Sequence, residues 1–203
     1  MARLCIKFGM GDAKINLALA RRTSLRPARR TACTVASQER LALSGCWPIL
    51  LMMTEPQDLI EEHLQQARVM QVATVRGGRP WVCSVYFVAD EQQRLYWLSW
   101  PSRRHSRDIA ANDRVAVAIA VKTDKPVIGI QAEGRATVVT DSTEVQRVMQ
   151  RYTEKYGEGS EFYNNFVAGK NLHELYRFTP ETYVLFDELY FKDGAAVQKL
   201  SLS

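Results

Sequence analysis

Two apolar stretches joined by a polar glycine turn open the patterned part of the chain. Residues 69–75 and 80–88 are rich in β-branched and aromatic side chains, which is typical of strands. Between them stands Arg76-Gly77-Gly78-Arg79, and glycine readily takes the positive φ of a tight hairpin turn. Residues 95–99, aromatic and apolar, follow a second polar turn. The pattern therefore predicts three consecutive strands joined by short turns.

The later strands are predicted from one continuous apolar run and several shorter ones. Residues 115–121 alternate valine or isoleucine with alanine almost without a polar position, which predicts a strand buried on both faces. Residues 127–139 read as a long strand that is bent or bulged at Gly134. The last strand candidates are residues 175–178, 183–186, 189–191 and 197–202.

Three helices are expected before, within and after these strands. Thr54 can cap the first, whose apolar stripe includes His63 as a partly exposed residue. Ser102 or Ser106 can cap a short helix over residues 107–112, and Asp141 or Ser142 one over residues 143–156. The whole predicts five or six antiparallel strands that close into a small barrel, which would remove exposed sheet edges.

Charge divides the chain into a leader and a body. Residues 1–52 hold nine Lys/Arg against two Asp/Glu, whereas residues 53–203 hold 18 against 20. The leader resembles a transit peptide in composition, but a disordered leader is the favoured interpretation, and Met52-Met53 offers a second start if the reading frame is over-extended. We expect a disordered basic leader over 1–52 and one folded domain over 53–203. The net charge of +5 thus belongs to the leader, and nucleic-acid binding by the body is not expected.

Cysteine usage and hydropathy indicate the cellular compartment of the protein. Three of the four cysteines lie in the leader, and neither a disulfide framework nor metal-ligand spacing is visible. No apolar run approaches the roughly 20 residues that span a bilayer. We therefore expect a cytoplasmic protein with no metal site and no membrane partner. Cys83, alone in the body, reads as a small core residue, with a reactive thiol as the alternative.

Candidate chemistry gathers where the strand 95–99 ends. Ser99 and Ser102 bring hydroxyl groups, and Arg103, Arg104 and His105 bring cations, just before a helix. Guanidinium groups, hydroxyls and the free N–H groups of a helix N-terminus together suit a phosphate. A solvated cationic turn is the alternative reading.

This order of elements resembles the FMN-binding split barrel of the pyridoxamine 5′-phosphate oxidase-like superfamily over residues 59–202. The residues that carry the resemblance are Trp81-Val82-Cys83, Arg104-His105, Glu133-Gly134-Arg135 and Tyr190-Phe191-Lys192-Asp193. It implies a mainly β (α+β) fold, a six-stranded antiparallel split β-barrel with flanking helices. The strand at residues 81–86 lacks two cations of the oxidase pattern, and no Arg-Leu-His segment stands near the C-terminus. The resemblance therefore does not extend to pyridoxamine phosphate as substrate.

The resemblance also implies roles for residues. Arg104 would grip the FMN phosphate, His105 would replace a second cation, and Ser99 would offer a hydroxyl group. Trp100, at the strand end, would wall the site. The remaining cofactor-binding candidates are the backbone of Val82, Cys83, Ser84 and Val85 along the isoalloxazine ring, with Ser102 and Arg103 in the loop.

Two function classes follow. The first is an FMN-dependent oxidoreductase of a small-molecule substrate, in which the cofactor carries the electron chemistry and no side chain is named as catalytic. The second is a non-catalytic flavin- or haem-binding protein of storage or stress, for which His173 or His105 could be the axial ligand. In either case we expect a homodimer, with cofactor sites at the subunit boundary.

Overall fold

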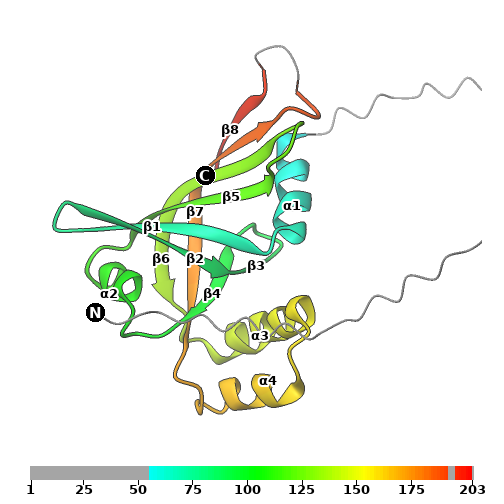
Figure 1. The fold of residues 1–203 in the computed structure, drawn as a ribbon. Helices are drawn as coiled ribbons and strands as arrows, with labels where there is room; N and C mark the ends of the chain where they lie inside the picture. Colours follow the sequence, from blue (N-terminus) through cyan, green and yellow to red (C-terminus); the bar gives the residue numbers. More distant parts are fainter. Residues whose placement is uncertain (1–54, 192–194, 203) are drawn as a thin grey trace, which may run out of the picture. The chain divides into compact units, whose positions relative to one another are not determined.

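The computed structural model describes residues 55–191 and 195–202 (Figure 1). Within them one antiparallel sheet curls into a half-barrel with four helices alongside, so the predicted split-barrel α+β class is confirmed. The leader 1–52 and the expected cap Thr54 lie outside the described residues. The elements are α1 (Pro56–Gln66), β1 (Val69–Arg76), β2 (Arg79–Tyr86), β3 (Val88–Ala89), β4 (Leu95–Ser99), α2 (Arg104–Ala111), β5 (Arg114–Lys122), β6 (Ile128–Val138), α3 (Ser142–Tyr156), α4 (Ser160–Val167), β7 (Glu174–Asp187) and β8 (Val197–Ser201).

The sheet order is β2-β1-β5-β6-β7-β4-β3, with β8 paired to β7. The β1–β2 hairpin turns at Gly77 and Gly78, whose φ angles are +57° and +72°, as the sequence predicted. The sheet contains eight strands rather than six. The two-residue β3 is separate from β2, and β8 pairs antiparallel with the C-terminal part of β7. β2 is an edge strand, which leaves one row of its backbone groups without a strand partner among the described residues.

The segments predicted near the C-terminus are connected differently from the prediction. Residues 175–178 and 183–186 belong to one strand, β7, which passes through a register shift opposite Gly134 of β6. A Cβ atom at Gly134 would lie 2.2 Å from the Thr179 carbonyl oxygen, so only glycine fits this close approach. The strand expected at residues 189–191 is wrong: the Asp187 carboxylate accepts the backbone N–H groups of Leu189 and Tyr190, which folds this segment into a turn.

The β5 strand corrects a second prediction. Val115, Val117 and Ile119 are buried, whereas the alanines between them are exposed. The strand is therefore covered on one face, and its small side chains lie on the open face of the sheet. Successive residues of the strand point to opposite faces, but the residues on both faces are apolar. The sequence therefore contains no change of polarity that would distinguish the exposed face from the buried one.

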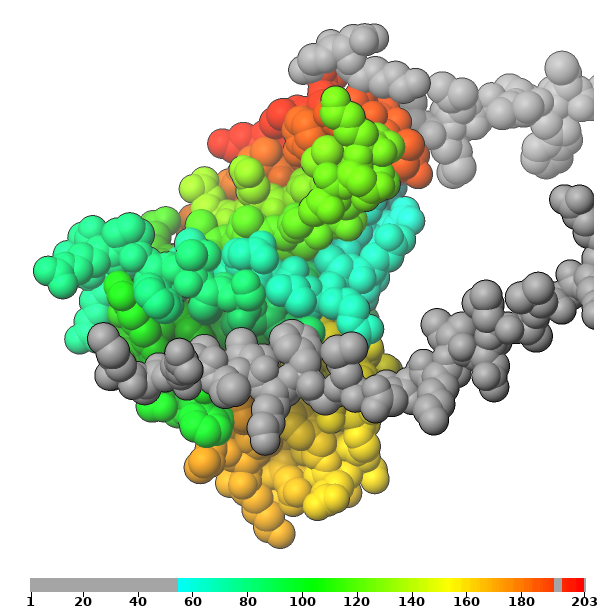
Figure 2. Space-filling model, in the orientation of Figure 1, coloured from blue at the N-terminus to red at the C-terminus, as the bar shows by residue number. Residues whose placement is uncertain are grey.

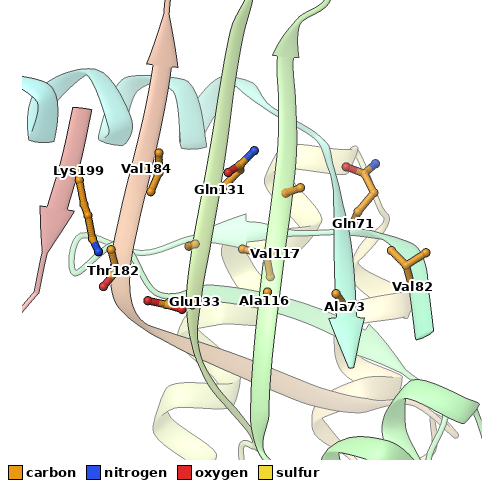
Figure 3. A pocket seen from close by; sticks show the side chains of 12 residues that line it. Gln71, Ala73, Val82, Ala116, Val117, Gln131, Glu133, Thr182, Val184 and Lys199 are labelled. Carbon is orange, nitrogen blue, oxygen red and sulfur yellow. The ribbon is translucent and has the colours of Figure 1, made fainter. Parts of the chain in front are cut away.

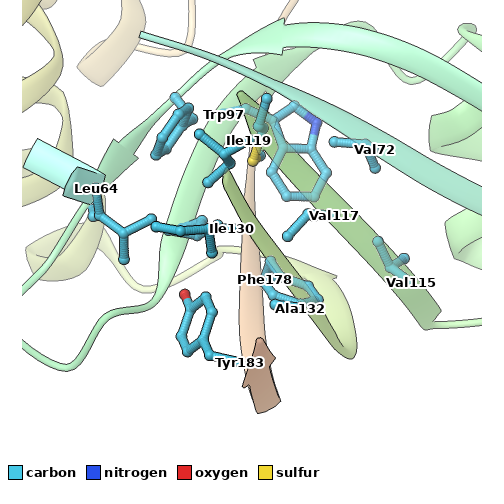
Figure 4. Packing of buried hydrophobic residues seen from close by; sticks show 14 of the residues in the cluster. Leu64, Val72, Trp97, Val115, Val117, Ile119, Ile130, Ala132, Phe178 and Tyr183 are labelled. Carbon is cyan, nitrogen blue, oxygen red and sulfur yellow. The ribbon is translucent and has the colours of Figure 1, made fainter. Parts of the chain in front are cut away.

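The main core fills the concave side of the half-barrel. Figure 4 shows Leu64 of α1 among side chains from the sheet, including Ile119, Ile130 and Tyr183. Trp97 is fully buried and stacks on Tyr176 at a centroid distance of 5.4 Å. Burial of each such large side chain contributes about 1.5–3 kcal/mol.

Of two helix details, one departs from the prediction and one agrees with it. His63 is 5 % exposed, not partly exposed as expected, because its Nε2 lies 3.2 Å from Oδ2 of the fully buried Asp187. The α3 cap follows the prediction, since Asp141 Oδ1 accepts the Glu144 N–H at 2.7 Å.

Candidate functional site

The cationic loop connects β4 to α2 through one tight turn. The chain leaves β4 at Ser99 and turns so that the Arg103 N–H donates to the Trp100 carbonyl at 3.0 Å. α2 begins at Arg104, three residues earlier than expected, and its N-cap residue Arg103 makes no side-chain cap. The predicted caps are wrong: Ser102 makes no cap, and Ser106 lies inside the first turn and bonds elsewhere. The first N–H groups of α2 therefore have no side-chain acceptor and can receive an anion.

Beneath this loop lies a buried hydroxyl–imidazole cluster. Ser106 Oγ donates to Ser99 Oγ at 3.1 Å, and Ser99 Oγ lies 2.6 Å from His105 Nε2. All three side chains are buried. Burial, reinforced by the charge of Arg103, lowers the pKa of His105, and Asp108 opposes this. The ring is therefore neutral at pH 7, and its Nε2 shares one hydrogen bond with the Ser99 hydroxyl beneath the cationic loop.

Arg104 lies on the side of the loop that faces the edge strand. Its guanidinium is 4.4 Å from the centroid of the Trp81 ring on β2, and its Nε is 3.6 Å from Asp108 Oδ2. The Asp108 carboxylate is buried and also accepts the Thr74 hydroxyl at 3.1 Å. An aromatic face and a carboxylate thus hold a guanidinium that stays 42 % exposed. α2 packs against β1 and β2, and Figures 1 and 2 show it next to the hairpin.

Sequence reasoning missed Trp81 and Asp108 as partners of Arg104. Asp108 stands four residues after Arg104, which is the spacing of side-chain neighbours on a helix, so it could have been found. Trp81 comes from another element, and no local pattern connects it to the loop.

Arg103 lies on the other side of the loop. Its guanidinium is 5.2 Å from the Trp100 ring centroid, and Trp100 meets His173 edge-on at 5.6 Å. His173 Nδ1 lies 2.6 Å from Asn171 Oδ1 and 3.2 Å from Trp100 Nε1, and it cannot donate to the first while accepting from the second. Each tautomer of the neutral ring satisfies one of these contacts: Nδ1 accepts from Trp100 Nε1, or Nδ1–H donates to Asn171 and leaves the lone pair on Nε2.

The β2 candidates divide between the two faces of the sheet. Cys83 and Val85 pack toward the core, whereas Val82 and Ser84 are exposed on the open face. Burial raises the pKa of the Cys83 thiol to about 11, so the thiol stays protonated at neutral pH and reads as a core side chain.

The structure therefore brings Arg104 together with β2 and places Ser99 and His105 beneath them. The exposed Ser102 lies in the turn, and Arg103 and Trp100 face His173. In the described ranges no group of three His, Cys, Asp or Glu side chains could hold a metal ion. No described helix is both long enough and apolar enough to cross a membrane.

The open face of the sheet lies on the other side of β2 from the Trp81 ring and Arg104. A shallow cavity of 420 Å³ lies on it, floored by alanines of β1 and β5 and flanked by Val82 of β2 (Figure 3). Gln131, Glu133 and Lys199 bring polar groups to its other side. The side chain of Val82 lies on this face, whereas its backbone is the part predicted to line the cofactor.

Comparison with known proteins agrees with the fold. The family model described as Pyridoxamine 5′-phosphate oxidase matches residues 56–186. No curated protein matches the sequence. A putative pyridoxamine 5′-phosphate oxidase from Listeria innocua is 20% identical, with a TM-score of 0.52 over 64% of this chain and 98% of that one. A conserved hypothetical protein from Mycobacterium tuberculosis is 14% identical, with a TM-score of 0.58 over 67% and 86%.

A haem-binding protein from Mycobacterium smegmatis shares the fold as well, at 13% identity and a TM-score of 0.55 over 70% of this chain and 57% of that one. At such identities the structural likenesses establish the fold alone. The family model covers well over half of the chain, including every strand from β1 to β6 and most of β7. The chain therefore belongs to the pyridoxamine 5′-phosphate oxidase family.

Proposed function

We propose that the protein binds FMN and acts as an FMN-dependent oxidoreductase of a small-molecule substrate. One observation carries the proposal: the exposed guanidinium of Arg104 lies at the uncapped N-terminus of α2, directly against the edge strand β2. An anion site and an extended backbone edge are thereby side by side, which suits a ligand with a phosphate at one end and a flat ring at the other.

The residues present fit such a ligand. Arg104, the first N–H groups of α2 and the Ser102 hydroxyl would hold the phosphate, while the backbone of Val82 to Val85 would line the ring. The buried Ser99 and His105 would fix the loop from beneath. FMN, when bound, supplies the electron transfer, and the protein supplies binding, orientation and exclusion of water.

We also propose a homodimer that pairs through the open sheet face. The exposed alanines of β5 offer a small, flat, apolar surface, and the residues that the structure describes leave it uncovered. A second copy placed on it by a two-fold axis would bury this surface and close the cofactor sites at Val82.

Reconstitution tests the proposal directly. The apoprotein should quench flavin fluorescence when FMN is added, and it should bind FMN more tightly than riboflavin, which has no phosphate. Bound FMN should then be reduced by a nicotinamide or another donor and reoxidised during a screen of small substrates. Saturable FMN binding without turnover of any substrate would favour the non-catalytic alternative.

His173 favours haem as the second candidate ligand. In the tautomer whose Nδ1–H donates to Asn171 Oδ1 at 2.6 Å, Nε2 is free to coordinate iron. Burial and the Arg103 charge lower the pKa of His173, so the ring is neutral at pH 7 as a metal ligand must be. If the site takes haem, His173→Ala should abolish the Soret band, whereas FMN binding should not depend on this residue.

A further inference from the structure

A second polar cavity lies between α1, β3 and α3, away from the loop that carries Arg104. Its volume is 600 Å³, and Figure 1 shows β3 between the end of α1 and α3. Its lining residues are Gln65, Val88, Ala89, Arg147, Gln150, Arg151, Glu154 and Lys155. None of them belongs to the proposed flavin site.

Three cations line this cavity from one side of α3. Arg147, Arg151 and Lys155 are spaced four residues apart, so their side chains lie in one row along the helix. Glu91 pairs with Arg151 and lies 3.8 Å from Arg147. Asp90 lies 3.7 Å from Arg147. Carboxylates therefore compensate the charge at the Arg147 end of the row.

The Lys155 end has no such compensation. Lys155 makes no ion pair with any described residue, and its Nζ lies 3.3 Å from the Leu64 carbonyl oxygen and 4.8 Å from the Phe87 ring centroid. Burial, followed by the nearby charge of Arg68, lowers the pKa of Lys155 to about 8. A carbonyl and an aromatic face cannot neutralise an ammonium group, so the amine lacks a counter-charge that an anion in the cavity would supply.

We propose that this cavity binds a small oxyanion-bearing molecule, with the Lys155 ammonium as its anchor and Arg147 as its second cation. The shared ligand chemistry is a phosphate or a carboxylate group. Arg147 can turn toward such a group because its ion pairs are long, at 3.7–4.0 Å. The Gln65 side chain adds an amide donor at the cavity wall, whereas the Gln150 amide donates to Glu154 Oε1 at 3.0 Å.

The reactivity of the Lys155 amine tests this proposal in the full-length protein. The chain is treated briefly with acetic anhydride at pH 7.5, and the acetylation of each lysine is measured by peptide mass spectrometry. The probes are inorganic phosphate and succinate. Sodium chloride at the same ionic strength is the control for nonspecific screening of charge. A probe at ten times its dissociation constant should slow acetylation of Lys155 about 11-fold, because only about one site in 11 stays free. Acetylation of the exposed Lys170 should not change.

Three further measurements define the outcome. Arg147→Gln should remove most of the protection of Lys155. The protection should persist in Arg104→Ala, so its result does not depend on whether the flavin proposal is correct. The affinity for phosphate should fall as the pH rises from 8 to 9, because the amine loses the proton that the anion requires. The other charged side chains near the row are those of Arg68, Arg147, Arg151, Glu91 and Glu154. Protection by phosphate alone or by succinate alone would identify the oxyanion class. Equal acetylation of Lys155 with and without both probes would overturn the proposal.

Discussion

The side chain of Arg104 gives the sharpest prediction for cofactor binding. FMN carries a phosphomonoester with a charge near −2 at pH 7, and a guanidinium can meet two of its oxygens at once. Charged hydrogen bonds contribute about 1.5–3 kcal/mol. Because 42 % of the Arg104 side chain is exposed, we expect the lower half of this range. Arg104→Ala should therefore weaken FMN binding by about 1.5–2 kcal/mol, or roughly 10- to 30-fold.

The same substitution also leaves Asp108 without its cation. The Asp108 carboxylate is buried, and only the Thr74 hydroxyl would still bond it, so its charge would oppose a bound phosphate. The double variant Arg104→Ala/Asp108→Asn removes this charge but keeps an acceptor for Thr74, and it should recover part of the lost FMN affinity. Arg104→Lys should recover part as well, because a lysine keeps the charge but not the two-pronged geometry.

Titration of each variant with FMN and with riboflavin, followed by flavin fluorescence at fixed ionic strength, measures these effects. Riboflavin should bind the wild type and Arg104→Ala equally. Arg107→Ala is the matched control, since Arg107 is exposed on the same helix and makes no ion pair with any described residue. Arg94 would be a poor control, because its guanidinium bonds the buried Asp90 at 2.8 Å. Equal losses for FMN and riboflavin would show damage to the fold and refute the phosphate assignment.

Four other predictions concern stability and assembly. The pKa of His105 is lowered in the folded protein, so below about pH 6.5 the unfolded chain binds a proton that the folded ring does not. Stability should therefore fall from pH 7.5 to 5.5, and His105→Gln should flatten this fall in the midpoints of urea unfolding. Parallel pH profiles of the variant and the wild type would contradict this prediction. Gly134→Ala should destabilise the fold by about 1–3 kcal/mol or more in urea unfolding, and Gly129→Ala, where the nearest atom is 3.6 Å from the new Cβ, should have little effect; similar losses would refute the close approach. Ala118→Arg should turn a dimer into a folded monomer in sedimentation, and a persistent dimer would exclude the open face as its interface. A chain starting at Met53 should keep its melting temperature and FMN affinity, and its failure to fold would show that residues 1–52 are structural.

Local signals in the sequence were sufficient where structure depends on neighbours in the chain. The Gly77-Gly78 turn and the Asp141 cap each involve residues at most four positions apart, and both were predicted. The cation-rich strand end was also visible, although the start of α2 was placed too late, because the hydroxyl group of Ser106 bonds to Ser99 in the preceding strand instead of capping a helix.

The remaining features depend on contacts between distant segments. The burial of His63 requires Asp187, which is 124 positions away, so the helical pattern alone could not show it. The pairing of Arg104 with Trp81 similarly requires α2 to pack on β2. The open face of β5 was missed because alanine is apolar and gives the same signal in a core and on an uncovered surface.

The most direct test of the proposed function is the absorption spectrum of the full-length protein after incubation with equimolar FMN and haemin and removal of free ligand. We predict retained flavin bands at about 370 and 450 nm, with one FMN for each chain and weaker bands in Arg104→Ala. A Soret band near about 410 nm that disappears in His173→Ala, with no flavin retained, would contradict the account.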